Sequence, residues 1–162
     1  MPPSPGSLQR AVDLLRAAYR KQMGGDYASA IELYKGSIAE YPTAEAHTFL
    51  GWTYSFQGRF DEAIQECKIA IGVDPDFGNP YNDIGSYLVH LGQIQEAIPW
   101  LEKAKLAPRY EPRHFPYLNL ARIYMKLGRI DDAAREFEQA NFIQNSLDSL
   151  DLSDDDSPAV VH

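Results

Sequence analysis

The side chains that most often carry catalysis or bind metals are few and scattered in this chain. The four histidines, His47, His90, His114 and His162, include no pair four residues apart, the spacing that lets two imidazoles of one helix share a zinc ion. The single cysteine, Cys67, falls at an apolar position of a predicted helix, where a buried, unreactive thiol is expected rather than a nucleophile. The glycines form no phosphate-binding loop. We therefore expect no enzymatic activity, no metal and no cofactor.

The glycines and prolines instead mark a repeat along the chain. Four glycines follow one another at intervals of 33, 34 and 36 residues, and three prolines at intervals of 33: Gly25, Gly58, Gly92 and Gly128, then Pro42, Pro75 and Pro108. A constant period in this range is typical of stacked helical hairpins. Between these marks the apolar residues recur at helical spacing, as Leu50 and Tyr54 do before Gly58. The sequence predicts an all-α protein of about four helix-turn-helix repeats.

Composition narrows the possible partners. The 162 residues carry a net charge of −8, with a pI near 4.9. Nucleic-acid binding needs a basic surface, so this charge argues against it. No apolar run reaches the length of a membrane span, and residues 1–10 lack the apolar core of a secretory signal. A cytoplasmic protein with no nucleic-acid and no membrane partner is expected.

The two ends of the chain differ in composition from the repeats. Residues 1–7 contain three prolines and are predicted to form a disordered lead. Residues 146–162 carry five aspartates and no basic residue, and they are predicted to form a disordered acidic tail. This tail could simply aid solubility. Two alternatives are that it folds back onto Arg122, Lys126 and Arg129, or that Ser153 before three aspartates is a kinase site.

The repeated hairpins resemble those of the tetratricopeptide repeat family. The family's pattern has a large residue, a Leu-Gly pair, a tyrosine, an alanine with a large residue four positions later, and a proline. The second repeat follows it with His47, Leu50-Gly51, Tyr54, Ala63, Cys67 and Pro75. The third has Tyr81, Ile84-Gly85, Leu88, Ala97, Leu101 and Pro108; the fourth has Tyr117, Leu120-Ala121, Tyr124, Ala133, Phe137 and Asn145. The first departs in its opening helix, which can be aligned as Val12, Leu15-Arg16, Tyr19 or as Leu14, Ala17-Ala18, Lys21.

This resemblance implies a right-handed α-solenoid over residues 8–145, with repeats at about 8–42, 43–76, 77–110 and 113–145. One hairpin cannot bury its apolar face alone, so neighbouring hairpins must stack. Small residues should let paired helices approach closely, while large ones fill the space beside them. The small positions are Gly51, Gly85, Ala121, Ala63, Ala97 and Ala133.

The resemblance also implies a function and a site. The first helices of such repeats line a concave groove, and residues between the packing positions lean into it. We expect a non-catalytic interaction module or adaptor that binds a peptide or protein segment with Trp52, Phe56, Asn82, Ser86, His90, Arg122 and Lys126. Alternatively, Trp52 and Phe56 merely pack against the neighbouring repeat.

Two other functions are alternatives to a general adaptor: recognition of chaperone tails and a structural role. Co-chaperone members of the family bind terminal carboxylates of chaperone tails with Lys, Asn and Arg side chains from three repeats. Here Phe49 stands where the second repeat would supply its Asn, so Asn82 and Arg122 alone do not make that clamp. The other alternative is a structural subunit. An apolar strip with Phe137 and Phe142 on the last helix would then support self-association through the C-terminal repeat.

Overall fold

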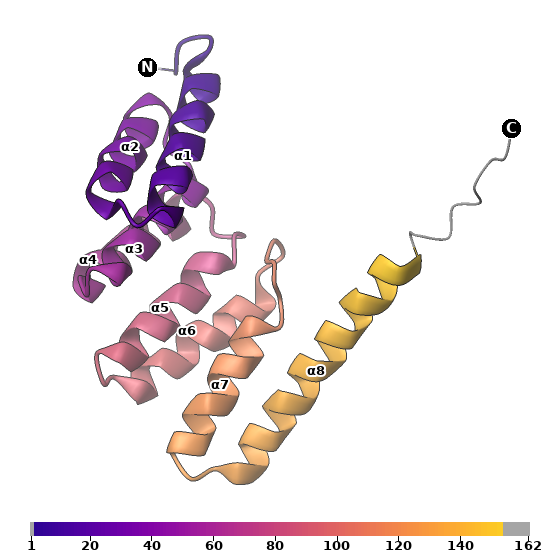
Figure 1. Ribbon diagram of the computed structural model, residues 1–162. Helices are drawn as coiled ribbons and strands as arrows, with labels where there is room; N and C mark the ends of the chain where they lie inside the picture. Colours follow the sequence, from indigo (N-terminus) through magenta and orange to yellow (C-terminus); the bar gives the residue numbers. More distant parts are fainter. Residues whose placement is uncertain (1, 154–162) are drawn as a thin grey trace, which may run out of the picture. The chain divides into compact units, whose positions relative to one another are not determined.

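The computed structural model describes residues 2–153, which form eight α-helices (Figure 1). The prediction of an all-α chain of four helical hairpins is confirmed. Two compact units contain these helices: Met1–Tyr110 holds α1 to α6, and Glu111–His162 holds α7 and α8. The helices are α1 (Ser7–Met23), α2 (Tyr27–Glu40), α3 (Ala44–Phe56), α4 (Phe60–Val73), α5 (Asn79–His90), α6 (Ile94–Leu106), α7 (Phe115–Lys126) and α8 (Ile130–Ser153).

Within the first unit the helices pair in sequence order and then stack. α1 packs on α2, α3 on α4 and α5 on α6, and these three hairpins are joined by contacts of α2 with α3 and of α4 with α5. In the second unit α7 packs on α8. Each hairpin therefore covers the apolar face of the next within the first unit, as the repeat pattern requires. No helix among residues 2–153 is long and apolar enough to cross a membrane, and a cytoplasmic location stays a prediction.

The recurring glycines make the turns between the paired helices. Gly25, Gly58, Gly92 and Gly128 have φ between +72° and +82°, the left-handed region that a side chain disfavours. At the second turn the Arg59 amide donates to the Tyr54 carbonyl at 3.0 Å, which satisfies one of the last carbonyls of α3. The glycine period seen in the sequence is thus a period of backbone turns.

This turn conformation gives a first testable prediction. Gly92→Ala is expected to lower the free energy of unfolding by about 1 kcal/mol, because alanine is strained at φ +78° even though no atom lies within 4 Å of the added Cβ. Gly72→Ala is the matched control. Gly72 lies in the last turn of α4 with equally open space, so alanine there is expected to stabilise the helix by ~0.5–1 kcal/mol. Thermal unfolding followed by circular dichroism measures both, and equal effects would contradict the argument.

The small residues at the helix pairs are buried, as predicted. Ala63 and Ala97 are fully buried, and a Cβ added to Gly51 would lie 2.9 Å from the Ala63 carbonyl oxygen. The first repeat follows the same plan with Ala18, which is fully buried and precedes Gly25 as Gly51 precedes Gly58. The structure therefore favours the second of the two alignments, with Leu14, Ala17-Ala18 and Lys21.

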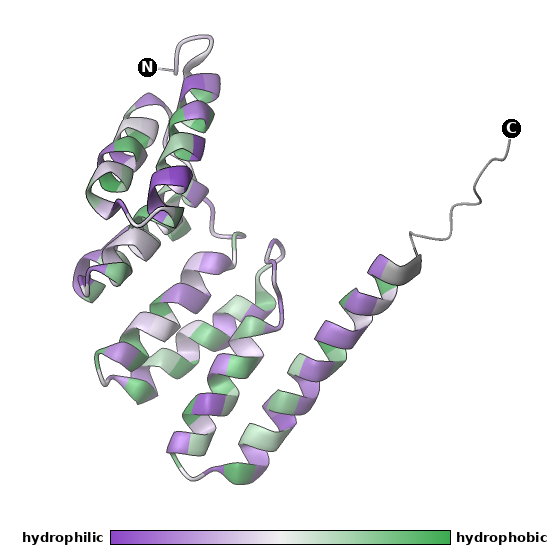
Figure 2. Cartoon of the chain, in the orientation of Figure 1, coloured by the Kyte–Doolittle hydropathy of each residue, from purple (hydrophilic) through white to green (hydrophobic). Residues whose placement is uncertain are grey.

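The C-terminal helix is longer than expected. α8 continues to Ser153, so residues 146–153 of the predicted disordered tail are helical and that boundary is wrong. No proline or glycine interrupts the segment, and Ser146 and Ser149 donate their hydroxyls to the carbonyls of Phe142 and Asn145, both at 2.8 Å. Hydrophobic and hydrophilic residues alternate along α8 (Figure 2). Residues 154–162, with the acidic run after Ser153, lie outside the described residues.

Candidate functional site

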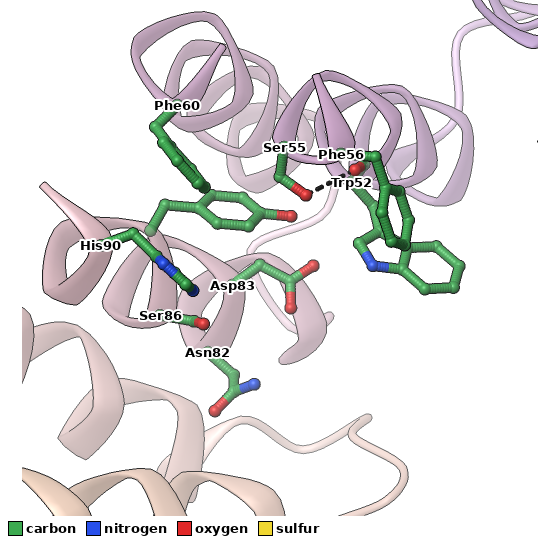
Figure 3. Close-up of a pocket in the computed structure, with 9 residues that line it drawn as sticks. Trp52, Ser55, Phe56, Phe60, Asn82, Asp83, Ser86 and His90 are labelled. Atoms are coloured by element: carbon green, nitrogen blue, oxygen red, sulfur yellow. Dashed lines mark hydrogen bonds between the residues drawn. The ribbon is translucent and has the colours of Figure 1, made fainter. Parts of the chain in front are cut away.

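A pocket of about 360 Å³ lies between α3 and α5 of the first unit (Figure 3). It contains five of the seven residues predicted to line a groove: Trp52, Phe56, Asn82, Ser86 and His90. Four further residues complete it: Ser55, Phe60, Asp83 and Tyr87. Residues from two successive hairpins thus meet at one concavity, as the repeat resemblance implied. Their part in binding stays a prediction.

Aromatic rings from α3 form one wall of the pocket. The ring centroids of Trp52 and Phe56 are 5.2 Å apart. Phe56 also stacks on Tyr27 of the preceding hairpin, with centroids 5.2 Å apart and the planes 4° from parallel. Even so, 49% of the Phe56 surface is exposed. The alternative that Phe56 packs against its neighbouring repeat is therefore compatible with a place in the pocket, because one face stacks while another stays open.

A second aromatic group stands across the pocket. The His90 ring stacks on Phe60, with centroids 5.0 Å apart and the planes 6° from parallel. The Phe60 ring also lies 6.0 Å from that of Tyr87. Tyr87 is 5% exposed, and its hydroxyl lies close to the Ser55 side chain without a hydrogen bond of good geometry. The pocket thus contains a buried hydroxyl that could bond to a ligand.

The polar side chains come mainly from α5. Asn82, Ser86 and His90 are spaced four residues apart, so they form one stripe along the helix. Asp83 stands next to this stripe, and Figure 3 shows its carboxylate between the Trp52–Phe56 side and the Phe60–His90 side. Burial raises the pKa of Asp83 to about 7, and a hydrogen bond with the Asn82 side chain offsets part of that rise.

The other two predicted site residues belong to the second unit. Arg122 and Lys126 lie one turn apart on α7, and both are exposed. The Arg122 guanidinium donates to the Asn119 amide oxygen at 3.2 Å. They do not line the pocket between α3 and α5. The seven predicted residues are thus divided between the two units.

Sequence reasoning missed Asp83, Tyr87 and Phe60 for a geometric reason. It assigned the residues of each first helix either to packing or to the groove, and Asp83 and Tyr87 lie at the boundary between these faces. Phe60 begins α4, the second helix of its hairpin, which was not considered as part of the groove. An acidic residue beside the polar stripe was the available signal for Asp83.

Cys67 and His47, two of the side chains that could carry catalysis, contribute to packing and to helix–helix contacts. Cys67 is fully buried, and burial raises the pKa of its thiol well above the usual value, which keeps it protonated. The His47 Nδ1 lies 2.7 Å from a carboxylate oxygen of Glu66, a contact that joins α3 to α4. Residues 2–153 contain no group of three acidic, histidine or cysteine side chains that could hold a metal ion. His162 lies outside this range.

Comparison with known proteins agrees with the geometry. Family models described as tetratricopeptide repeat match residues 24–77, 50–111 and 116–141. The small glutamine-rich tetratricopeptide repeat-containing protein 2 of Mycosarcoma maydis is 31% identical over 102 residues, which are 62% of this chain and 29% of that protein. This chain therefore spans less than a third of that relative's length.

Two solved structures extend the comparison. Pseudomonas aeruginosa pilF has a TM-score of 0.80 at 18% identity, over 86% of this chain and 64% of that chain, a likeness in fold alone. The second tetratricopeptide repeat domain of Spaghetti (RPAP3), bound to an HSP90 peptide, has a TM-score of 0.58 at 25% identity, over 61% of this chain and 93% of that chain.

Proposed function

The chain belongs to the tetratricopeptide repeat family, and we propose that it is a non-catalytic adaptor that binds a peptide or protein segment in its concave groove. The observation that carries this proposal is the pocket between α3 and α5. Its volume of about 360 Å³ falls within the range of ordinary ligand sites, and it combines aromatic walls with a few polar groups. Trp52 and Phe56 are suited to anchor a bound segment, since aromatic residues dominate the energetics of many interfaces.

The likeness to the RPAP3 domain supports a peptide as the partner class, while the pocket of the present chain favours a different peptide. The RPAP3 domain is bound to an HSP90 peptide of sequence SRMEEVD, in which three of the last four residues are acidic. In the present chain Asp83 presents a carboxyl group to the pocket, and Phe49 stands where the resemblance to co-chaperone members of the family implies an asparagine. Like charges within a low-dielectric pocket repel. We propose that the partner is not an acidic chaperone tail.

A substitution in the aromatic wall tests the groove. Trp52→Ala is expected to weaken capture of the partner from native lysate by about 30-fold or more, because truncating an interface anchor costs about 2 kcal/mol or more. Arg122→Ala, on α7 of the second unit, tests the other part of the predicted site and is expected to weaken capture as well. Circular dichroism melting of each variant shows whether the fold is kept. Capture that is unchanged in a folded Trp52→Ala variant would contradict binding in this pocket.

A structural subunit remains the second candidate, and one observation favours it. Phe142 on α8 is 70% exposed and, with Ile143 and Leu147, lines a shallow depression of about 200 Å³ in the second unit. An exposed apolar patch of this kind can mediate assembly. Phe142→Ser separates the two candidates: it leaves partner capture intact if the chain is an adaptor, and it reduces the sedimentation coefficient at high concentration if the chain assembles through α8.

A further inference from the structure

We infer that the pocket between α3 and α5 receives a lysine or arginine side chain, whose cationic head meets the Asp83 carboxylate between the rings of Trp52, Phe56 and Phe60. The partner would then be a basic segment. This inference rests on the proposed function and specifies the chemistry of its partner.

The charge of Asp83 favours a cationic ligand. Its carboxyl group lines the pocket and forms no ion pair with any residue between 2 and 153. A carboxylate that is half-buried and has no cation nearby is costly, and the raised pKa of Asp83 reflects that cost. By contrast, Asp74 and Asp132 each have an arginine partner, and the pKa of each is lowered by it. A cation supplied by a partner would give Asp83 the same kind of neighbour.

Aromatic rings surround the Asp83 carboxylate and can hold a cation. Trp52 and Phe56 stand on one side of Asp83, and Phe60 and His90 on the other (Figure 3). The face of an aromatic ring attracts a cation, and tryptophan does so most strongly. The same rings can cover the methylene stem of a lysine or arginine, which buries its apolar part while the head reaches the carboxylate. The chain already uses such contacts elsewhere, since the Arg129 guanidinium lies 4.6 Å from the centre of the Tyr124 ring.

The pocket also offers hydrogen-bond acceptors to a cationic head group. An ammonium group has three donors and a guanidinium has five, and all of them need acceptors once they leave water. Besides Asp83, the pocket offers the Tyr87 and Ser86 hydroxyls as acceptors. An uncharged apolar side chain would leave the Asp83 carboxylate without a cation, and an acidic side chain would add repulsion. The net charge of −8 further favours the approach of basic segments.

Short peptides test the inference directly. The probes are acetylated, amidated pentapeptides of alanine with lysine, arginine, norleucine or glutamate at the centre, titrated at pH 8 and low salt into the full-length ¹⁵N-labelled protein. We expect the lysine and arginine peptides to shift the Trp52 indole N–H and Asp83 amide signals. The norleucine peptide, which has the same stem without the charge, is expected to bind at least tenfold more weakly, and the glutamate peptide not measurably.

Two variants with the same change of net charge complete the test. Asp83→Asn keeps the shape of the side chain and is expected to weaken binding of the lysine peptide at least tenfold. Glu32→Gln, at an exposed position of α2 outside the pocket, is expected to leave it unchanged. Equal binding of the lysine and norleucine peptides, equal binding to wild type and Asp83→Asn, or shifts confined to residues outside the pocket would each overturn the inference.

Failure of this inference can be distinguished from failure of the proposed function. If the partner captured from lysate is lost with Trp52→Ala but kept with Asp83→Asn, a groove binds the partner without recognising a cation. If both variants capture as well as the wild type, the pocket is not the binding site and both proposals fail. If both lose the partner while the Glu32→Gln variant keeps it, both proposals are supported.

Discussion

Leu101→Ala is expected to lower the free energy of unfolding by about 2–5 kcal/mol, as large-to-small substitutions do in a packed core. Leu101 is fully buried in α6, where its side chain fills the space opposite Gly85 of α5. Removal of its three terminal carbons would leave a cavity that the close-packed hairpin cannot close by itself. Urea denaturation followed by circular dichroism measures the loss.

Adding a side chain at the same contact, which overpacks it, should also destabilise the hairpin. A Cβ placed on Gly85 would lie 2.6 Å from both Cγ and Cδ2 of Leu101, far closer than carbon atoms pack. Because Leu101 is buried, it cannot swing out of the way. Gly85→Val is therefore expected to cost about 1–3 kcal/mol, even though valine is a better helix former than glycine.

The double variant Gly85→Val/Leu101→Ala tests whether the two side chains share one packing site or destabilise the protein independently. Valine adds three carbon atoms at position 85, and alanine removes three at position 101, so the total volume is nearly conserved. The double variant is expected to be more stable than the sum of the single losses predicts, by about 0.5–3 kcal/mol. A strictly additive double variant would show that Gly85 and Leu101 do not share one packing site.

The second large effect concerns Asp83 and pH. Asp83→Asn is expected to raise the free energy of unfolding at pH 8 by about 2–4 kcal/mol, because the variant removes a charge that the folded protein holds half-buried without a cation. The gain is expected to fall to less than half of that value at pH 5. Urea unfolding of both proteins at the two pH values gives the difference directly.

The direction of this pH dependence follows from the pKa of the Asp83 carboxyl group in the folded and in the unfolded protein. The ordinary pKa of 3.8 applies to the unfolded chain, whereas the folded protein has a pKa of about 7. Between these values the folded protein binds more protons than the unfolded chain, so its stability falls as the pH rises through this window. Glu32→Gln, at an exposed position outside the pocket, makes the same change of net charge and provides the control. If the difference in unfolding free energy between wild type and Asp83→Asn stays constant from pH 5 to pH 8, the pKa of Asp83 is not raised in the folded protein.

A stabilising Asp83→Asn substitution would also bear on function. Natural proteins keep a costly buried group where function uses it, and stability and activity then oppose each other. If the variant is both more stable and unable to bind the lysine peptide, the cost of Asp83 is explained by the partner. The same variant therefore links the stability measurement to the binding measurement.

The local pattern was sufficient for the helices and their turns. Glycine at Gly58 and Gly92, with a period near 34 residues, specifies left-handed turns because that conformation disfavours side chains. Ala63 and Ala97 at fixed distances after these glycines predict closely paired helices. Both signals lie within one hairpin, so they can be read without knowing how the hairpins stack. The same local logic failed after residue 145, where acidic composition suggested disorder although α8 continues to Ser153.

What the sequence determined by itself was the repeat, its hairpins and the stripe of Asn82, Ser86 and His90 on one helix face, since periodicity alone assigns residues to faces. Only the tertiary structure decided what stands opposite that stripe. The stacking of α4 on α5 brings Phe60 beside His90, and it encloses the Asp83 carboxyl between rings from three helices. Those residues are far apart in the chain, and their contact depends on the angle and register between hairpins, which no local spacing specifies.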